Sequence, residues 1–307
     1  MAQSRRDFLN LAWMGAAAVA AGGCVTKAGC AAGGRMALYA DKPIANLRVG
    51  VVGLGRGQAG ITGFTLVPGG YISAICDVNA ARRERTLKYL ADKKAPTPKV
   101  YGDKGPEDWK RMCEDPDVDL VYNATPWDLH VPIALYAMKC GKHVVIEVPS
   151  AFTVDECWAL VEASEKTRRH CMQLENCCYG ETEMLAYNLV RKGLLGEITH
   201  GEGAYIHDLR TYNYAAWDDA KVGGHGGMDF LMVLRLSYCL QNGLPLDMNV
   251  YDLASWCCLC ELTEKSADNR GRSMDIPDFT RGGWKTTKPL GLVDVDLGKL
   301  KFEAPKA

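Results

Sequence analysis

The 307-residue sequence lacks an excess of charge of either sign, because 36 lysines and arginines stand against 37 aspartates and glutamates and the net charge is −1. Without a basic surplus, a nucleic-acid-binding surface is not expected. The sequence also lacks the low hydrophobicity of a disordered chain, since 48% of its residues are hydrophobic and 24% are charged. No internal repeat or low-complexity segment follows residue 45. The composition therefore predicts a globular protein of about two domains.

The N-terminal segment, residues 1–45, is predicted to be an export signal followed by a linker. A pair of arginines, Arg5 and Arg6, precedes a stretch from Phe8 to Thr26 that contains no charged residue. This pattern is typical of twin-arginine signals. A transmembrane helix is the weaker alternative, because the stretch is mostly Ala and Gly, which contribute little to membrane insertion. We therefore expect a periplasmic or cell-envelope protein without a transmembrane span.

The thirteen cysteines are predicted to be core residues rather than disulfides or metal ligands. Most lie singly in apolar runs, where a free cysteine behaves as a small hydrophobe. The spacing Cys257-x-x-Cys260 lacks the second pair of ligands that a zinc site requires, so no metal is predicted. Cys24 follows three small residues and resembles a lipoprotein cleavage site, although the usual branched residue is absent. Lipid attachment at Cys24 and simple cleavage both stay open.

From residue 46 the chain alternates between strand and helix patterns. The expected strands are residues 47–52, 71–77, 118–124 and 143–148, and the expected helices are residues 80–94 and 130–139. Such alternation predicts a doubly wound parallel sheet, so residues 46–176 are expected to form a Rossmann domain in an α/β protein.

A glycine-rich turn follows the first of these strands. Its glycines would let the backbone approach a pyrophosphate, while the amides at the start of the next helix point at the same group. Two registers fit: Gly53-x-Gly55 with Gln58 in third position, or Gly55-x-Gly57-x-x-Gly60. Both predict a dinucleotide site in the same place.

Asp77 ends the second expected strand and is suited to accept hydrogen bonds from a ribose diol. Its charge would repel a 2′-phosphate, which favours NAD over NADP. Arg82 and Arg83 follow closely and blur this choice, although a solvated helix face explains them equally well.

Residues 117–130 and 141–149 closely resemble the glucose-fructose oxidoreductase/inositol dehydrogenase superfamily. In most of that superfamily a Glu-x-Pro triplet carries a lysine that assists proton movement at the reacting hydroxyl. This chain has Val148 at that position, and valine cannot exchange a proton. An oxidoreductase acting on a sugar or polyol is therefore the disfavoured alternative.

Five later segments are similar to glycoside hydrolase family 109, whose members are exported bacterial NAD-dependent α-N-acetylgalactosaminidases. These segments are residues 164–172, 174–179, 202–209, 223–230 and 277–282. In that family, bound NAD⁺ takes a hydride from C3 of the sugar, the C2 proton and the C1 leaving group depart by elimination, water adds, and the hydride returns. The resemblance implies a glycosidase for N-acetylgalactosaminides whose redox-neutral cycle suits export.

The resemblance also implies the site residues. The implied NAD contacts are Gly53, Gly55, Arg56, Gly57, Asp77, Trp127, Asp128, Leu129, His130, Glu147, Val148 and Asn176. Tyr205 matches a sugar-contacting tyrosine. Tyr179 is the candidate for acid/base help, which requires a nearby positive charge to lower its pKa from about 10. The alternative for Tyr179 is a half-buried tyrosine with a satisfied hydroxyl.

Between Leu209 and Gly223 the chain is much shorter than the family pattern. After residue 179 we expect one strand, residues 197–206, and helices over residues 228–241 and 249–265. One strand cannot form a sheet, so residues 177–307 are predicted to be an incomplete α+β substrate domain. An NAD-binding remnant without catalysis is thus a third hypothesis. A break in the gene model and assembly into a homo-oligomer also stay open.

Overall fold

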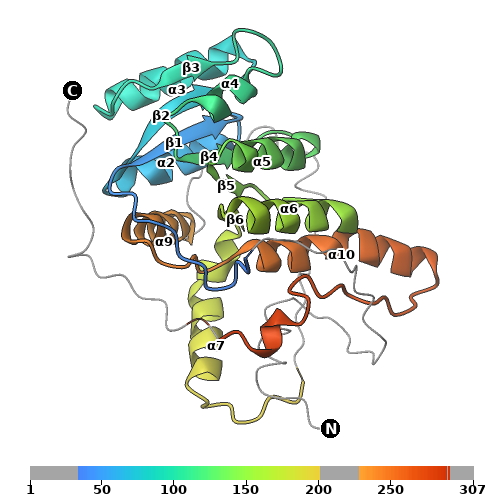
Figure 1. The fold of residues 1–307 in the computed structure, drawn as a ribbon. Coiled ribbons are helices and arrows are strands. Elements are labelled where there is room, and N and C mark those ends of the chain that lie inside the picture. Colours follow the sequence, from blue (N-terminus) through green and yellow to red (C-terminus); the bar gives the residue numbers. More distant parts are fainter. Residues whose placement is uncertain (1–33, 201–227, 289, 291–307) are drawn as a thin grey trace.

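A single parallel sheet of six strands forms the centre of the computed structural model, which describes residues 34–200, 228–288 and 290 (Figure 1). The strands are β1 (Leu47–Val52), β2 (Gly70–Cys76), β3 (Lys99–Tyr101), β4 (Leu120–Asn123), β5 (His143–Ile146) and β6 (Cys171–Gln173). Their spatial order is β3-β2-β1-β4-β5-β6, and all neighbours run parallel. This order defines the doubly wound Rossmann sheet, which confirms the predicted fold class of the N-terminal part.

Helices cover both faces of the sheet. One core cluster joins the sheet to α2 (Gly57–Leu66), α3 (Ala80–Asp92) and α9 (Met228–Asn242), and the other joins it to α4 (Trp109–Glu114), α5 (His130–Lys139), α6 (Val154–Thr167) and α10 (Val250–Asp268). In β5, Val145 faces the first cluster, while Val144 and Ile146 face the second. The strands are apolar on both faces because both faces are buried.

Two of these helices, α9 and α10, come from the C-terminal part of the chain. Figure 1 shows them in orange, next to helices and strands of the N-terminal part. Val233 of α9 packs against α2, where a Cβ on Gly63 would lie 3.0 Å from its Cγ2. Asn249 starts α10 with a capping box, whose other member is Asp252, and α10 lies along α6. Both helices match the predicted helical stretches.

The remaining described segments depart more from the sequence-based expectations. Residues 197–200 are not in a strand, which contradicts the start of the predicted strand; its other residues, 201–206, lie outside the described residues. The unpredicted elements include α7 (Glu181–Arg191) and the short 3-10 turns η1 (Trp127–Leu129), η2 (Asn176–Tyr179) and η4 (Gly283–Lys285). The strands β3 and β6 and the helices α4 and α6 also have no counterpart in the sequence-based predictions.

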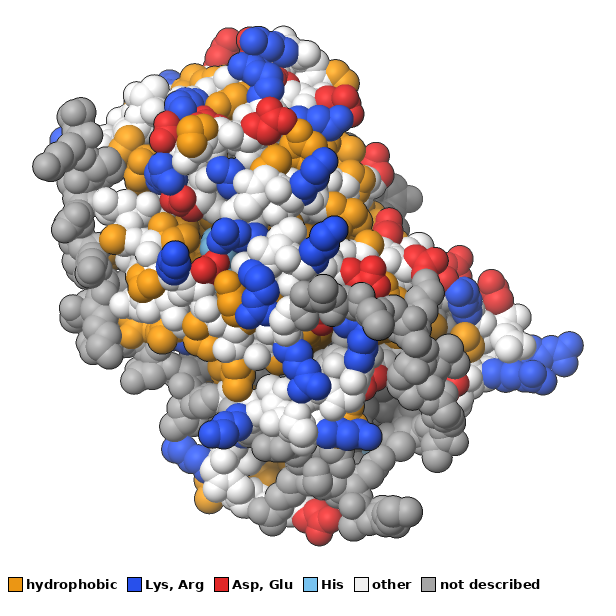
Figure 2. Space-filling view, in the orientation of Figure 1, with side chains coloured by type: hydrophobic (Ala, Val, Ile, Leu, Met, Phe, Trp, Pro, Cys, Tyr) orange, Lys and Arg blue, Asp and Glu red, His pale blue; other side chains and the backbone are white. Residues whose placement is uncertain are grey.

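Every cysteine in the described ranges is free, and seven of them are buried: Cys76, Cys113, Cys157, Cys171, Cys239, Cys257 and Cys258. Within the same ranges no cluster of His, Cys, Asp and Glu is suited to a metal ion, and no helix is long and apolar enough to cross a membrane. Basic and acidic side chains are intermixed over the face drawn in Figure 2, in keeping with the balanced net charge.

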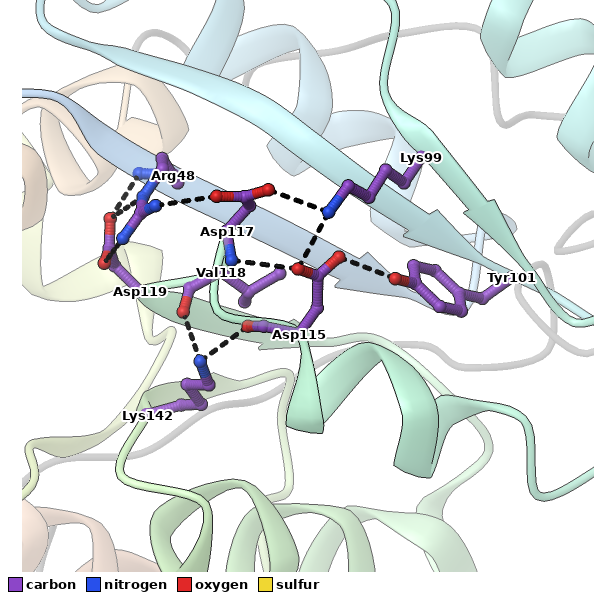
Figure 3. A network of polar contacts seen from close by, with 8 residues as sticks. All are labelled: Arg48, Lys99, Tyr101, Asp115, Asp117, Val118, Asp119 and Lys142. Atoms are coloured by element: carbon purple, nitrogen blue, oxygen red, sulfur yellow. Dashed lines mark hydrogen bonds and ion pairs between the residues drawn. The ribbon is translucent and has the colours of Figure 1, made fainter.

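A polar network ties the amino ends of several strands together (Figure 3). Arg48 at the start of β1 donates from Nε and Nη2 to the two carboxylate oxygens of Asp119, at 2.9 and 2.7 Å. Lys142, just before β5, donates from Nζ to the backbone carbonyl oxygens of Asp115 and Val118, both at 2.7 Å. The other members are Lys99, Tyr101 and Asp117. This network occupies the amino edge of the sheet and leaves the carboxyl edge for a ligand.

Candidate functional site

The residues predicted to contact a cofactor follow the carboxyl ends of the strands. The glycine turn follows β1, Asp77 follows β2, residues 127–130 follow β4, Glu147 and Val148 follow β5, and Asn176 follows β6. In a doubly wound sheet, ligands bind at this edge, beside the point where the strand order reverses. Here that point lies between β1 and β4. The fold therefore gathers all of these segments along one edge.

Gly53 makes the tight turn that leaves β1. Its φ is +89°, and a Cβ on it would lie 2.3 Å from the backbone oxygen of Ala124 in the loop after β4. Only glycine fits such a position. Gly60, by contrast, lies inside α2, where a Cβ would lie 2.1 Å from Cε1 of Tyr122 in β4. Thus Gly53-x-Gly55 forms the ligand-facing turn, and Gly60 lets α2 approach the sheet.

The start of α2 is open to an anion. Arg56 is its N-cap residue, and no side chain caps the helix there. The first backbone N–H groups of a helix have no partner within the helix, and together with the helix dipole they favour a negatively charged group. Gly55 and Arg56 are both exposed. The turn and the helix start thus offer amides and a guanidinium to a pyrophosphate.

Asp77 is buried at the carboxyl end of β2, and its carboxylate already binds the turn. Oδ2 accepts the N–H of Leu54 and Oδ1 accepts the N–H of Asn79, both at 2.8 Å. Nη1 of Arg82 lies 3.6 Å from Oδ2. A carboxylate has about four acceptor positions, so Asp77 can hold the turn and still accept hydrogen bonds from a ribose diol. The glycine turn, the uncapped helix and Asp77 together fit a dinucleotide.

His130 is buried and joins the loops after β4 and β5. Its Nδ1 lies 2.8 Å from the carbonyl oxygen of Pro149, and its Nε2 lies 2.9 Å from that of Thr125. Asn123 donates to the carbonyl oxygen of His130 at 3.0 Å. Both ring nitrogens of His130 therefore lie against backbone carbonyl oxygens, so His130 joins the two loops that shape the site. Sequence reasoning missed Asn123, although it lies within the motif that carries the resemblance.

Trp127 and Val148 are exposed apolar side chains in the loops at the same edge. The Trp127 side chain is 58% exposed, and its ring lies 5.4 Å from that of Phe152, centroid to centroid. Val148 is 40% exposed. The rings of Trp127 and Phe152 thus form an exposed aromatic pair at this edge.

Glu147 faces the sheet rather than open solvent. Its Oε1 accepts a hydrogen bond of 2.6 Å from the hydroxyl of Tyr122. Burial, with a further contribution from the Glu147 charge, raises the pKa of Tyr122 well above its usual value. Asn176, in the segment after β6, links the carboxyl edge of the sheet to α9, because its Nδ2 donates to Oδ1 of Asp229 at 2.5 Å. Through Asn176 and Asp229, the C-terminal helix α9 reaches the site.

The position of Tyr179 speaks against the acid/base role predicted for it. Its hydroxyl donates to Oδ2 of Asp247 at 3.0 Å, and Arg235 binds the same carboxylate from Nε and Nη2 at 2.8 and 2.6 Å. Burial and the charge of Asp247 raise the pKa of Tyr179 well above its usual value, whereas a base at neutral pH requires it to be lowered. Tyr179 is thus a buried tyrosine with a satisfied hydroxyl. Tyr205, the predicted sugar contact, lies outside the described residues.

The class of the protein follows from this edge and from comparison with known families. A family model described as "Oxidoreductase family, NAD-binding Rossmann fold" matches residues 47–174. Residues 47–174 are thus similar to the NAD-binding Rossmann domain of that family, in agreement with the observed parallel sheet. A second family model, "Glycosyl hydrolase 109, C-terminal domain", matches residues 179–219 and 212–286 as two pieces.

Curated relatives carry both parts. Glycosyl hydrolase family 109 protein 1 of Bacteroides fragilis strain YCH46 is 32% identical over 405 residues, which cover 79% of this chain and 87% of the relative. The alpha-N-acetylgalactosaminidase of Bacteroides fragilis strain ATCC 25285 is 30% identical over 406 residues, which cover 80% of this chain and 95% of that protein. The chain belongs to glycosyl hydrolase family 109, as the sequence resemblance predicts.

The alignments also show where this chain is short. The alignment has 405 positions but contains only 79% of the 307 residues of this chain, or about 243 residues. At the other positions, about 160, only the relative has a residue, and this number equals the length of a whole domain. The two pieces of the C-terminal family model meet at residues 212–219, between Leu209 and Gly223. This agrees with the shortened stretch inferred from the motifs.

Among solved structures, the scyllo-inositol dehydrogenase of Lactobacillus casei with bound NAD(H) and scyllo-inositol is 23% identical. The match covers 50% of this chain and 43% of that protein, with a TM-score of 0.44.

Proposed function

We propose that this chain is an NAD-dependent glycosidase that hydrolyses α-N-acetylgalactosaminides by the redox-neutral cycle of its family. The observation that carries this proposal is the coexistence of a match to an NAD-binding Rossmann domain with matches to the family 109 C-terminal domain in one chain. NAD, when bound, supplies a reversible hydride acceptor. Val148, which replaces the usual lysine of the wider superfamily, supports a cycle without net oxidation.

The described residues have defined roles in this proposal. The amides of the glycine turn and the start of α2 bind the pyrophosphate, and Asp77 binds a ribose diol. His130 and Asn123 hold the loops that present the exposed ring of Trp127 toward the nicotinamide and sugar side. Asn176 and Asp229 connect this edge to α9.

The test is hydrolysis of p-nitrophenyl α-N-acetylgalactosaminide by the purified full chain, without added NAD, in deuterium oxide. The proposal expects released p-nitrophenol, no accumulation of NADH, and deuterium at C2 of the product, because the elimination step removes the C2 proton. Release without deuterium at C2 contradicts the cycle. NADH that accumulates with a free polyol would instead indicate a net oxidoreductase.

A second candidate function is NAD binding without hydrolysis, and the shortened stretch favours it. The relatives have about a domain's length of aligned chain that this protein lacks. Replacing residues 210–222 with the corresponding segment of the Bacteroides fragilis alpha-N-acetylgalactosaminidase separates the two candidates. Hydrolysis by the chimera but not by the natural chain supports the second candidate, whereas hydrolysis by the natural chain refutes it. Resequencing the gene across these codons tests for a break in the gene model.

We further propose that residues 1–45, of which 1–33 lie outside the described residues, direct export by the twin-arginine route. A cofactor that is regenerated within each turnover suits a compartment without a pool of free NAD. Fractionation of cells expressing the chain with Arg5 and Arg6 replaced by lysine tests this: retention of the variant in the cytoplasm is expected, and unchanged export contradicts it. Replacing Cys24 with serine, followed by membrane extraction, tests the lipid anchor.

A further inference from the structure

The first turns of α3 place three arginines beside the ribose end of the cofactor site. Two of them bind backbone oxygens: Arg83 donates to Asp77 at 2.6 Å and to Gly102 at 3.2 Å, and Arg85 donates to Leu54 at 2.9 Å. Arg82 instead contacts the side chain of Asp77, with Nη1 at 3.6 Å from Oδ2. Arg85 therefore holds the glycine turn and Arg83 joins the segments that follow β2 and β3, whereas Arg82 pairs with the carboxylate predicted to bind the ribose.

The guanidinium of Arg82 also lies over the glycine turn. Its Cζ and Nη1 are each 3.5 Å from the position that a Cβ on Gly55 would take. It therefore occupies the space between Gly55 and Asp77, next to the start of α2. An adenosine ribose that binds Asp77, with its pyrophosphate on the turn, needs this same space.

The Arg82 contact is weak enough to be displaced. The Arg82 side chain is 49% exposed, and the separation of 3.6 Å exceeds that of a well-formed charge-assisted hydrogen bond. Because the Arg82 side chain is half-exposed, water can replace its contact with the buried Asp77 carboxylate. The Asp77 carboxylate, in contrast, is held by two short hydrogen bonds from backbone N–H groups. We therefore expect an entering ribose to displace Arg82 and to leave Asp77 in place.

We propose that Arg82 is a displaceable cation in the adenosine-ribose subsite and sets cofactor choice, so that the protein accepts NADP as well as NAD. After displacement, Arg82 remains tethered to α3 within reach of the ribose 2′ position. A 2′-hydroxyl binds Asp77. A 2′-phosphate is repelled by Asp77 but pairs with the Arg82 guanidinium, whose planar fork matches phosphate oxygens. This inference depends on the NAD-binding domain and not on the proposed hydrolysis.

The experiment measures dissociation constants of NAD and NADP for the purified chain by titration calorimetry, at low and high salt. We expect the natural chain to bind both cofactors. Arg82→Ala should weaken NADP binding by about tenfold or more, the usual cost of losing a charged hydrogen bond, and leave NAD affinity equal or slightly tighter because a competitor for Asp77 is gone. Arg82→Lys, which keeps the charge but not the fork, should fall between. The effect on NADP should shrink at high salt.

Lys88→Ala is the matched control, because Lys88 is also an exposed cation on α3 and loses the same charge. It should change neither affinity by more than about twofold, since exposed charges farther away are screened. The proposal is overturned if the natural chain does not bind NADP, if Arg82→Ala weakens NAD and NADP equally, or if Lys88→Ala reproduces the Arg82 effect. Binding is read without turnover, so loss of hydrolysis leaves this test intact.

Discussion

Replacing Gly53 with alanine should damage both folding and cofactor binding. The backbone of Gly53 has φ +89°, and the new Cβ would lie 2.3 Å from the Ala124 oxygen and 2.8 Å from the Thr125 nitrogen. The left-handed conformation alone costs alanine about 1–2 kcal/mol. Because the atoms that clash are backbone, relief requires the loop after β4 to move, which adds about 1–3 kcal/mol. We expect the free energy of unfolding to fall by about 2–5 kcal/mol, a large part of a typical domain's stability.

Gly141→Ala separates the two contributions. Gly141 has φ +78°, and nothing lies within 4 Å of its Cβ position, so it carries the conformational cost without the clash. Urea unfolding gives the stabilities, and titration with NAD gives the affinities. Gly53→Ala should lose more stability than Gly141→Ala and bind NAD at least about tenfold more weakly, because the moved turn no longer fits the pyrophosphate. Equal losses of stability with unchanged NAD affinity would refute this reasoning.

Three further predictions concern groups away from the turn. Burial lowers the pKa of His143 to about 4 and that of His170 to about 3 in the folded protein. In the unfolded chain a histidine has a pKa of about 6.5, so as the pH falls the unfolded chain binds protons before the folded protein does. The free energy of unfolding should thus fall as pH drops from about 6.5 toward 4, and His143→Asn should flatten that slope in urea titrations; an unchanged slope contradicts it. Tyr179→Phe removes one hydrogen bond to Asp247 and should cost about 1 kcal/mol with unchanged NAD affinity, and a large loss of turnover at equal stability would restore a catalytic role. Lys142→Met removes the donor of two buried hydrogen bonds (Figure 3), and although the Asp115 oxygen keeps the Val118 N–H, the Val118 oxygen loses its lysine donor; the change should cost about 1–3 kcal/mol in thermal unfolding, whereas a neutral result contradicts it.

The strands and helices that the sequence predicts well are those whose apolar residues form one clear run or repeat that is buried in the fold. β1 agrees in both bounds, β2 and β5 agree to within two residues, and α5 agrees in both bounds. Their apolar runs are buried on both sides of the sheet, so the pattern is strong. The strands β3 and β6 are only three residues long and mix polar with apolar side chains, which gives no period to detect. α6 begins with a capping box formed by Thr153 and Glu156, a signal that the sequence does contain.

The residues of the candidate site also fall into a group that the sequence predicts and a group that it does not. Residues that act through backbone geometry, such as Gly53, or through their position after a strand, such as Asp77, are predictable because the local sequence determines both. Tyr179 is not, because its partners, Asp247 and Arg235, are more than fifty residues away along the chain, and only folding brings them to its hydroxyl. The contact of Arg82 with Asp77 is predictable only in part. The sequence places a cation near Asp77, but the position of the Arg82 guanidinium over Gly55 depends on how α3 packs against the glycine turn.

The two C-terminal helices on the sheet have a consequence for how such a chain can change. α9 and α10 follow the shortened stretch, yet each covers one face of the Rossmann sheet. The described helices before and after residues 192–227 therefore together cover both faces of the NAD-binding sheet. The length of the chain between α7 and α9 can thus change while the helices that cover the two faces of the sheet stay in place.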